Sequence, residues 1–125
     1  MSMSIRKGRC HCGAVEFEVV IPGDFGELRR CNCSLCRKRG VVMASVPLEH
    51  FRVTQGADQL TLYQWNTRVA EHYFCKTCGI YTHHKRRSVP TEFAYNVACM
   101  DGVGMIDESK IVILDGQASP RVDSR

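Results

Sequence analysis

The cysteines of this chain fall into three close groups, and their spacing constrains the fold more than any other feature of the sequence. The chain has 125 residues and eight cysteines. Seven of the cysteines form the motifs C-x-C, C-x-C-x-x-C and C-x-x-C, at positions 10–12, 31–36 and 75–78. Cysteines this close together chelate a metal ion well but are poor disulfide partners. The spacing therefore predicts metal sites that connect distant parts of the chain.

The length and composition are those of a globular protein. We expect one domain over residues 1–125, because the chain is too short for a second independent core. Hydrophobic residues make up 44% of the chain and charged residues 24%, which argues against disorder. The chain has no apolar run long enough for a signal peptide or a membrane span, so we expect a cytoplasmic protein. Reducing cytosol favours metal ligands over disulfides.

The hydrophobic pattern predicts a mainly β fold. Residues 14–21 alternate apolar and acidic side chains with the period of a half-buried strand. A helical turn is expected at 34–40, with Ser34 as N-cap and Gly40 as its end. A hairpin is expected across Asn66, and the end of the chain at 116–125 is expected to be a polar tail. Other strands are expected at 26–31, 41–46, 59–65, 67–75, 80–86 and 91–98, with a short apolar run at 111–114.

The pair Cys75 and Cys78, followed by Gly79, has the form of a zinc knuckle, which supplies half of a tetrahedral site. Cys10 and Cys12 can supply the other half, because residues i and i+2 of an extended chain point to the same side. Such a four-cysteine site would be closed and structural. The competing pairing of Cys31 and Cys33 with the knuckle stays open, although it would leave three cysteines scattered.

The favoured pairing leaves Cys31, Cys33 and Cys36 as a group of three. Three protein ligands and one open position are the arrangement of catalytic zinc, and a substrate thiolate suits the fourth position. Arg37 and Arg39 follow directly and are candidate partners for the carboxylates of such a thiol. The basic triplet at 37–39 can also be read as an ordinary solvated face. Three histidines are alternative fourth ligands, namely His72, His83 and His84.

The eighth cysteine, Cys99, lies alone in the apolar segment FAYNVACM and is predicted to be a buried, inert thiol.

Four segments together resemble a known family in order and spacing. The segments GRCHCGAVEFEV, RCNCSLCRKRG, FCKTCG and YNVACMDG resemble the glutathione-dependent formaldehyde-activating enzymes, whose domain also occurs in centromere-protein-V-like proteins. The likeness covers residues 8–102. It implies a β-tent fold of several small antiparallel sheets around a structural zinc site.

The resemblance also implies roles for the seven clustered cysteines. The structural zinc ligands of the family match Cys10, Cys12, Cys75 and Cys78, and the catalytic zinc ligands match Cys31, Cys33 and Cys36. The implied activity is that of a carbon–sulfur lyase, which joins formaldehyde and glutathione into S-hydroxymethylglutathione in the reverse direction. The expected cofactors are thus two Zn²⁺ ions, and the expected partner is a small, glutathione-like thiol.

Two other functions stay open from the sequence. The chain could be a non-catalytic zinc-binding module whose basic loops at 37–39 and 85–87 contact nucleic acid or an acidic protein. The formal charge of +4 gives this little support, since seven thiolates and two Zn²⁺ would reduce it to about +1. The chain could also be a thiol or metal redox sensor, because a site with three protein ligands binds zinc less firmly than a site with four cysteines.

Overall fold

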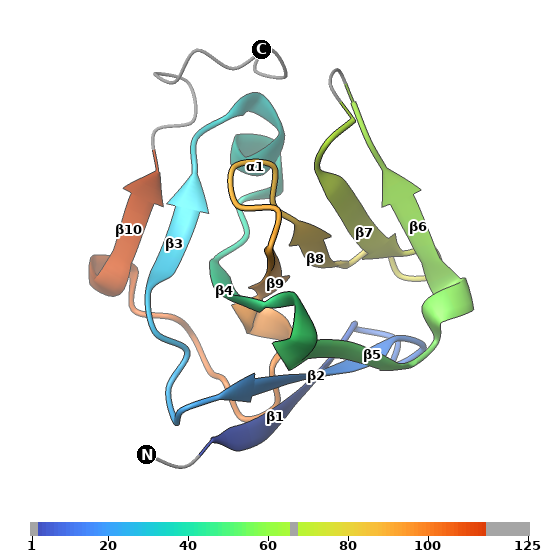
Figure 1. Ribbon diagram of the computed structural model, residues 1–125, viewed down its shortest axis with the longest axis horizontal. Helices are drawn as coiled ribbons and strands as arrows, with labels where there is room; N and C mark the ends of the chain where they lie inside the picture. The colour runs from blue at the N-terminus through green and yellow to red at the C-terminus, as the bar shows by residue number, and fades with distance from the viewer. Residues whose placement is uncertain (1–2, 66–67, 115–125) are drawn as a thin grey trace.

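The computed structural model describes residues 3–65 and 68–114, which form ten β-strands, one α-helix and four short 3-10 helices (Figure 1). The prediction of a mainly β fold is confirmed. The predicted hairpin tip at Asn66 and the predicted polar tail at 116–125 lie outside the described residues. No helix in the described ranges has the length and apolar composition needed to span a membrane.

A three-stranded antiparallel sheet, with strand order β1-β2-β5, forms the base of the molecule in Figure 1. It consists of β1 (Ser4–Arg9), β2 (Glu16–Ile21) and β5 (Phe51–Gln55). The alternation that predicted β2 is visible in its burial, since Phe17, Val19 and Ile21 are buried and the residues between them are only partly so. This apolar face points into the core.

The remaining strands form a seven-stranded sheet with the order β10-β3-β4-β9-β8-β7-β6. All neighbours are antiparallel except β10 and β3, which run parallel. A single residue pair, Arg29 with Met43, joins β3 to β4, so the sheet divides there into two smaller parts. The strands are β3 (Leu28–Cys31), β4 (Met43–Pro47), β6 (Leu60–Tyr63), β7 (Glu71–Cys75), β8 (Tyr81–Lys85), β9 (Glu92–Asn96) and β10 (Ile111–Leu114).

The main hydrophobic core lies between the two sheets. Its members come from β2, β4, β5, β9, the 3-10 helix Val97–Cys99 and the residue that follows this helix. They are Phe17, Val19, Ile21, Ala44, Val46, Phe51, Tyr95, Val97, Cys99 and Met100. The prediction that Cys99 is buried is confirmed, and burial, aided by the nearby thiols of Cys10 and Cys78, raises the pKa of Cys99 to about 12. This thiol is therefore uncharged at neutral pH.

The only α-helix in the described ranges, α1 (Ser34–Arg39), follows β3 closely. Gly40 ends it with φ of 66°, in the left-handed region, as predicted. The predicted N-cap is wrong by one residue, because Ser34 is the first helical residue and Cys33 occupies the cap position with extended backbone. The carbonyl of Cys33 accepts the N–H of Arg37 at 2.8 Å. The helix therefore begins at a cysteine of the central motif.

Two features of the sheets have no clear signal in the sequence. β1 has the burial pattern of a mostly exposed edge strand, and its side chains do not alternate between apolar and polar. The parallel pairing of β10 with β3 joins segments about 80 residues apart and has no local turn to predict it.

A substitution at Gly56, between β5 and β6, would show how closely this residue packs against the turn between β1 and β2. Its φ is +79°, and an added Cβ would lie 1.9 Å from the carbonyl oxygen of Ala14. We expect Gly56→Ala to lower the free energy of unfolding by about 2 kcal/mol or more, through backbone strain and a clash with rigid backbone. Chemical denaturation measures this. The matched control is Gly104→Ala, where no atom lies within 4 Å of the added Cβ. Equal stability of the two variants would contradict the packing described.

Candidate metal centre and pocket

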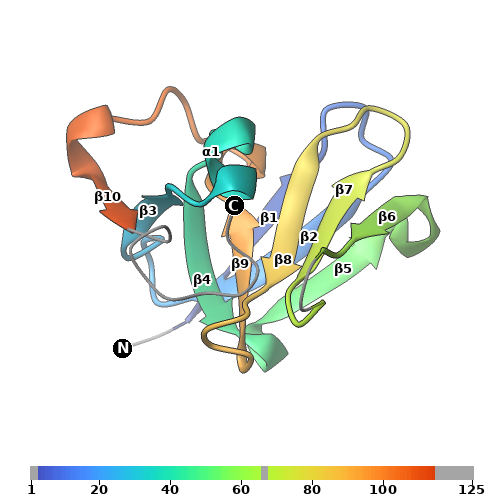
Figure 2. The same ribbon diagram turned by 90° about the horizontal axis from the view of Figure 1, so that it is seen from above.

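The first cysteine cluster joins two turns that are distant in sequence. Cys10 and Cys12 lie in the turn between β1 and β2, whereas Cys75 is the last residue of β7 and Cys78 lies in the turn that follows it. Figure 2 shows these two turns side by side. The structure thus groups the pairs as the favoured spacing argument did, and it excludes the alternative in which Cys31 and Cys33 complete the knuckle.

The geometry of this cluster fits a tetrahedral metal site. The Sγ atoms of Cys10 and Cys12 lie 3.7 Å apart, as do those of Cys12 and Cys75. A tetrahedron with zinc–sulfur distances of about 2.3 Å has sulfur–sulfur edges of about 3.8 Å. Gly79 has φ of 78°, and its N–H reaches the carbonyl of Cys75 at 2.8 Å, which closes the knuckle. The four residues therefore suit a closed, structural site.

The four thiols of this cluster differ in how readily they ionise. Burial opposes ionisation of Cys78, but the backbone N–H groups of Cys12 and Ile80 and the neighbouring thiols lower its pKa to about 6. For Cys12, the N–H of Ala14 favours the thiolate, but burial and the thiols of the other three cysteines raise the pKa to about 11. The four side chains could all be thiolates at neutral pH only with a positive ion between them.

The second cluster contains Cys31, Cys33 and Cys36, whose Sγ atoms lie within 4.8 Å of one another. Cys31 ends β3, Cys33 caps α1, and Cys36 lies three residues further along the same face of the helix. The neighbouring thiols of Cys31 and Cys33 raise the pKa of Cys36 above its ordinary value, and burial adds to this. A metal ion would again allow the three thiolates to coexist, and it would have three protein ligands.

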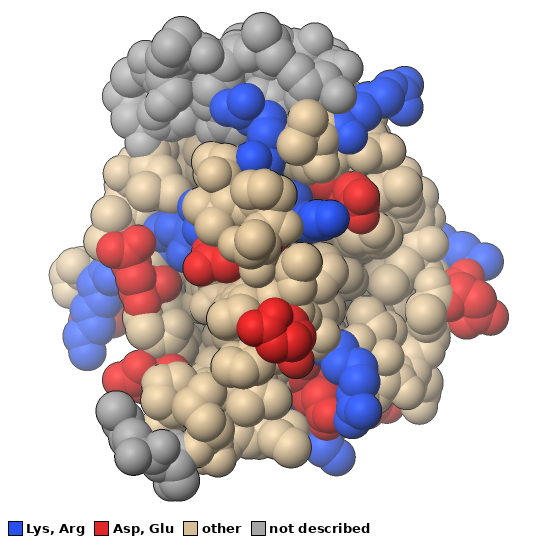
Figure 3. Space-filling model, viewed as in Figure 1, with Lys and Arg blue, Asp and Glu red and all other residues tan. Residues whose placement is uncertain are grey.

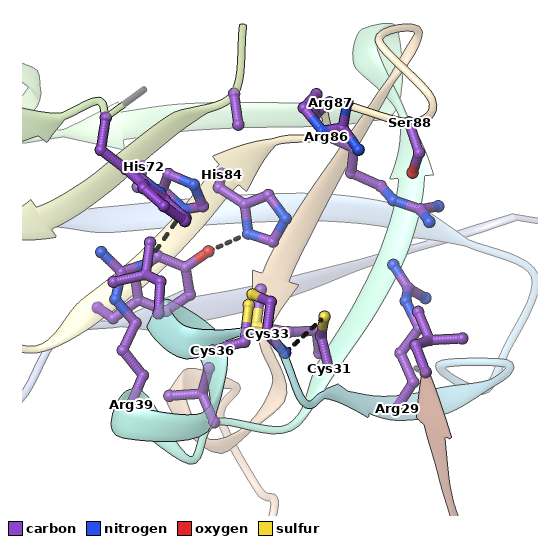
Figure 4. A pocket seen from close by; sticks show the side chains of 17 residues that line it. Arg29, Cys31, Cys33, Cys36, Arg39, His72, His84, Arg86, Arg87 and Ser88 are labelled. Carbon is purple, nitrogen blue, oxygen red and sulfur yellow. Dashed lines mark hydrogen bonds between the residues drawn. The ribbon is translucent and has the colours of Figure 1, made fainter. Parts of the chain in front are cut away.

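This second cluster lines a pocket, which Figure 4 shows from close by. α1 and β3 supply the cysteines, and β7, β8 and the segment after β8 supply polar side chains opposite them. The pocket also contains apolar contacts from Leu35, Val41 and Met43. A ligand in this pocket would therefore meet sulfur, charge and apolar surface together.

One wall of the pocket is a connected network of four side chains. The hydroxyl of Tyr81 is hydrogen-bonded to Nδ1 of His84, and the rings of His84 and His72 lie 4.9 Å apart. Arg39 donates to Nδ1 of His72 at 3.1 Å, and its guanidinium lies 4.0 Å from the centre of the Tyr81 ring. Since arginine has no acceptor, Nδ1 of His72 is the acceptor and its ring proton is on Nε2.

Burial keeps two members of this network uncharged. Burial lowers the pKa of His84 well below its ordinary value, and the positive charges of the pocket lower it further. Burial also raises the pKa of Tyr81 well above its ordinary value, although the nearby charge of Arg39 opposes this. At neutral pH, Tyr81 and His84 therefore form a neutral pair that holds one proton between oxygen and nitrogen.

The pocket is positively charged. Four arginines line it, and they are Arg29, Arg39, Arg86 and Arg87. Burial lowers the pKa of Arg29, and the charge of Arg86 lowers it further, whereas Glu27 and Glu92 act in the opposite sense. The like charges lie close enough to disfavour each other. An anionic ligand would relieve this repulsion.

The structure separates the two predicted substrate residues. Arg39 lies at the pocket and contacts His72 and Tyr81. Arg37 is exposed and lines a shallow groove with Tyr63 and Trp65 instead. The basic triplet therefore has two faces, of which only one reaches the cysteines.

The histidines that could have closed the three-cysteine cluster do not belong to it. His72 and His84 line the pocket, within the network of Tyr81 and Arg39. His83 is only 3% exposed, and its ring lies 4.5 Å from that of Phe51 and 4.7 Å from that of Tyr73. In the described part of the chain, the fourth position of this cluster has no histidine ligand.

Sequence reasoning singled out Arg39, His72 and His84 in other roles, but it did not predict that they form one wall of the pocket with Tyr81. Tyr81 was attributed to the sheet, and the segment at 85–87 was considered only as a basic loop. In a regular strand Tyr81 and His84 would project from opposite faces, so the sequence pattern gives no signal that they are in contact. The pairing of β7 with β8 has a register shift between Tyr73 and Phe74, and with this shift Tyr81 and His84 come into contact.

Comparison with known proteins identifies the class. The model of the family described as glutathione-dependent formaldehyde-activating enzyme matches residues 5–114. The chain belongs to this family, and the resemblance drawn from the cysteine framework is confirmed.

Several individual proteins are similar to this chain. A crystal structure of a Rhodobacter sphaeroides protein superposes with a TM-score of 0.81 at 53% identity, covering 86% of this chain and 98% of that one. A Halomonas elongata protein, provisionally named a glutathione-dependent formaldehyde-activating enzyme, is 36% identical over 81 residues, which are 58% of this chain and 51% of that protein. A Colletotrichum graminicola protein with the same provisional name is 30% identical over 77 residues, which are 58% of this chain and 40% of that protein. The matched segments thus span about half the length of these two relatives.

The metal content of cysteine variants would show whether each cluster holds its own metal ion. We expect the purified protein to hold two metal ions, and a variant with serine at Cys31, Cys33 and Cys36 to hold one and keep its fold. The double variant Cys10→Ser, Cys75→Ser should lose the fold, since both side chains are buried beneath the two turns. Elemental analysis with circular dichroism measures both properties. Two metal ions in the triple variant would contradict a second site at these cysteines.

The buried His83 gives the fold a pH dependence of known sign. Burial lowers the pKa of His83 to about 3, whereas the unfolded value is about 6.5. Between these values the unfolded chain binds more protons, so this residue makes stability fall as the pH decreases, by about 1.4 kcal/mol per unit below 6.5. We expect NMR to show a neutral His83 ring at pH 5 in the folded protein and a protonated ring in urea. A protonated ring in the folded protein at pH 5 would contradict the buried environment.

Proposed function

We propose that this chain is a zinc-dependent carbon–sulfur lyase-type enzyme that acts on a small thiol such as glutathione and on its aldehyde adduct. One observation carries the proposal, namely that the second cysteine cluster offers three thiols and opens into a positively charged pocket. The first cluster offers four thiols in a closed arrangement. Catalytic zinc sites usually have three protein ligands and an open position, as the second cluster would, whereas structural zinc sites have four, as the first cluster would. Membership of the family supports the same activity.

The residues of the second cluster suit zinc in number and type. Cys31, Cys33 and Cys36 would hold the ion, because clustered thiolates favour zinc and other soft metals over magnesium or calcium. When bound, zinc supplies a Lewis-acidic fourth position that keeps a substrate thiol deprotonated near neutral pH.

The reaction itself is a balanced addition. A lone pair on the substrate sulfur forms the C–S bond to the carbonyl carbon, and the π electrons of the C=O bond move to its oxygen. That oxygen then takes up a proton, which gives the hydroxymethyl thioether, and the reverse sequence releases thiol and aldehyde. The proton must come from a group in the pocket or from water.

Tyr81 is the residue that we assign to this proton transfer. Its hydroxyl lies in the pocket wall and is hydrogen-bonded to His84, so the pair can donate a proton to the carbonyl oxygen and take it back. Arg39 and His72 hold the Tyr81 ring and the His84 ring in place through their contacts. In this assignment Arg39 positions the acid rather than binding the substrate carboxylate.

The nucleic-acid alternative receives less support. Arg39 faces the pocket, and Arg86 forms an ion pair with Glu92 at 2.7 Å. Basic and acidic side chains are interspersed on the face shown in Figure 3, so this face offers no continuous basic stripe. The sensor alternative predicts reversible loss of one metal on oxidation without turnover, and it is therefore separated from the enzyme by an activity assay.

The test is acceleration of the exchange between glutathione and S-hydroxymethylglutathione in the presence of formaldehyde. Exchange NMR measures the rate, with the spontaneous reaction as background. We expect Cys33→Ser to abolish the acceleration and Tyr81→Phe to lower it by about 10² to 10⁴-fold without changing the affinity for glutathione. Tyr63→Phe is the matched control, because Tyr63 is exposed on β6 and lies outside this pocket.

The outcomes are distinct. A parent protein with both metals bound that leaves the exchange rate at the spontaneous value would overturn the enzymatic proposal. Equal rates in Tyr81→Phe and Tyr63→Phe would leave the enzyme in place and remove the role of Tyr81.

A further inference from the structure

Two arginine side chains converge at the end of the pocket beside Cys31. Arg29 lies on β3 two residues before Cys31, so both side chains project from the same face of the strand. Arg30, between them, projects from the other face and pairs with Glu108. The register of β3 thus places one positive charge next to one thiol in the pocket.

Arg29 is unusually buried for a charged residue. It is 8% exposed, and its Nη2 donates to the hydroxyl of Ser45. In the part of the chain that the structure describes, Arg29 forms no ion pair. A guanidinium has five N–H donors, so several of them remain available on the pocket side. A charge buried in this way is costly unless an anion accompanies it.

Arg86 approaches Arg29 from another element. It follows β8, its side chain is 19% exposed, and one Nη is held by Glu92. Figure 4 shows the side chains of Arg86 and Arg29 extending toward each other across the pocket, with Ser88 beside Arg86. Two guanidinium groups that face each other repel, and an oxyanion between them removes the repulsion and accepts hydrogen bonds from both.

We propose that Arg29 and Arg86, with Ser88, form a carboxylate-binding subsite for a thiol whose sulfur lies at Cys31, Cys33 and Cys36. The inference rests on the proposed function and adds to it the residues that bind a carboxylate of the thiol. The planar guanidinium groups match the two oxygens of a carboxylate.

The subsite takes over the role that the sequence suggested for Arg37 and Arg39. The guanidinium of Arg39 is already engaged by His72 and by the ring of Tyr81. Arg37 is exposed and lies outside this pocket. Arg29 and Arg86, by contrast, line the pocket together with the three cysteines.

The test uses two ligands that differ only at sulfur. Isothermal titration compares glutathione with S-methylglutathione, which keeps both carboxylates but has a blocked thiol. We expect Arg29→Gln to weaken the binding of both ligands by about tenfold or more, because a charge-assisted hydrogen bond is lost. Arg30→Gln, on the opposite face of the same strand, should bind both as the parent does. Cys33→Ser should weaken the binding of glutathione only.

These ligands separate failure of the subsite from failure of the proposed function. If Arg29→Gln and Arg86→Gln, both checked for native NMR spectra, bind S-methylglutathione as tightly as the parent, the subsite is overturned and the thiol chemistry is unaffected. Absence of any binding of S-methylglutathione to the parent also overturns the subsite. If Arg29→Gln weakens both ligands but Cys33→Ser changes neither, the subsite stands and the thiol site fails. Where Arg29→Gln does not fold, Arg86→Gln decides the outcome.

Discussion

The contact between four cysteines from two distant turns is the constraint on which the rest of the molecule depends. Cys12 and Cys75 are 63 residues apart, and their sulfurs approach to 3.7 Å. Around them lies a small cluster in which Val15 is fully buried and Val53 and Leu60 are partly so. This cluster joins the three-stranded sheet to β6 and β7 of the larger one. A contact with so large a sequence separation has a high entropic cost, which metal binding can offset.

The pocket depends on this connection although it lies elsewhere. Its sulfur ligands come from β3 and α1, whereas its tyrosine, histidines and Arg86 come from β7, β8 and the segment that follows. Holding the turn between β7 and β8 against the base of the molecule fixes the position of β8, and β8 carries Tyr81 and His84. The four-cysteine cluster and the pocket with the three-cysteine cluster are thus connected through β8. The cysteines and Tyr81 come from opposite sides of the pocket, whereas arginines are supplied from both sides, by Arg29 on β3 and by Arg86 after β8.

The cysteine motifs made the family, and with it the fold class, predictable from the sequence. Whether two cysteines can chelate one ion is decided by the few residues between them, which the sequence shows directly. The strand β2 was predictable for the same reason, since its alternation of Phe17, Val19 and Ile21 is complete within six residues. The edge strand β1 and the parallel pair of β10 with β3 were not, because their pairing is decided by distant partners. The contact of Tyr81 with His84 was not predictable, because it depends on a register shift between β7 and β8. Arg29 has no signal of burial in the sequence, because its burial follows from the register of β3 against β4.

The parallel pair of β10 with β3 has a consequence for the order of events during synthesis. Leu114 pairs with Cys31 and lines the pocket, so one edge of the pocket is built from nearly the last residues that the structure describes. At about 5–20 residues per second, the ribosome needs roughly 4–16 s to make the intervening 80 or so residues. During that interval the thiols of Cys31, Cys33 and Cys36 are not yet enclosed by their final neighbours. The nascent chain therefore exposes three clustered thiols to the cell before the pocket around them is complete.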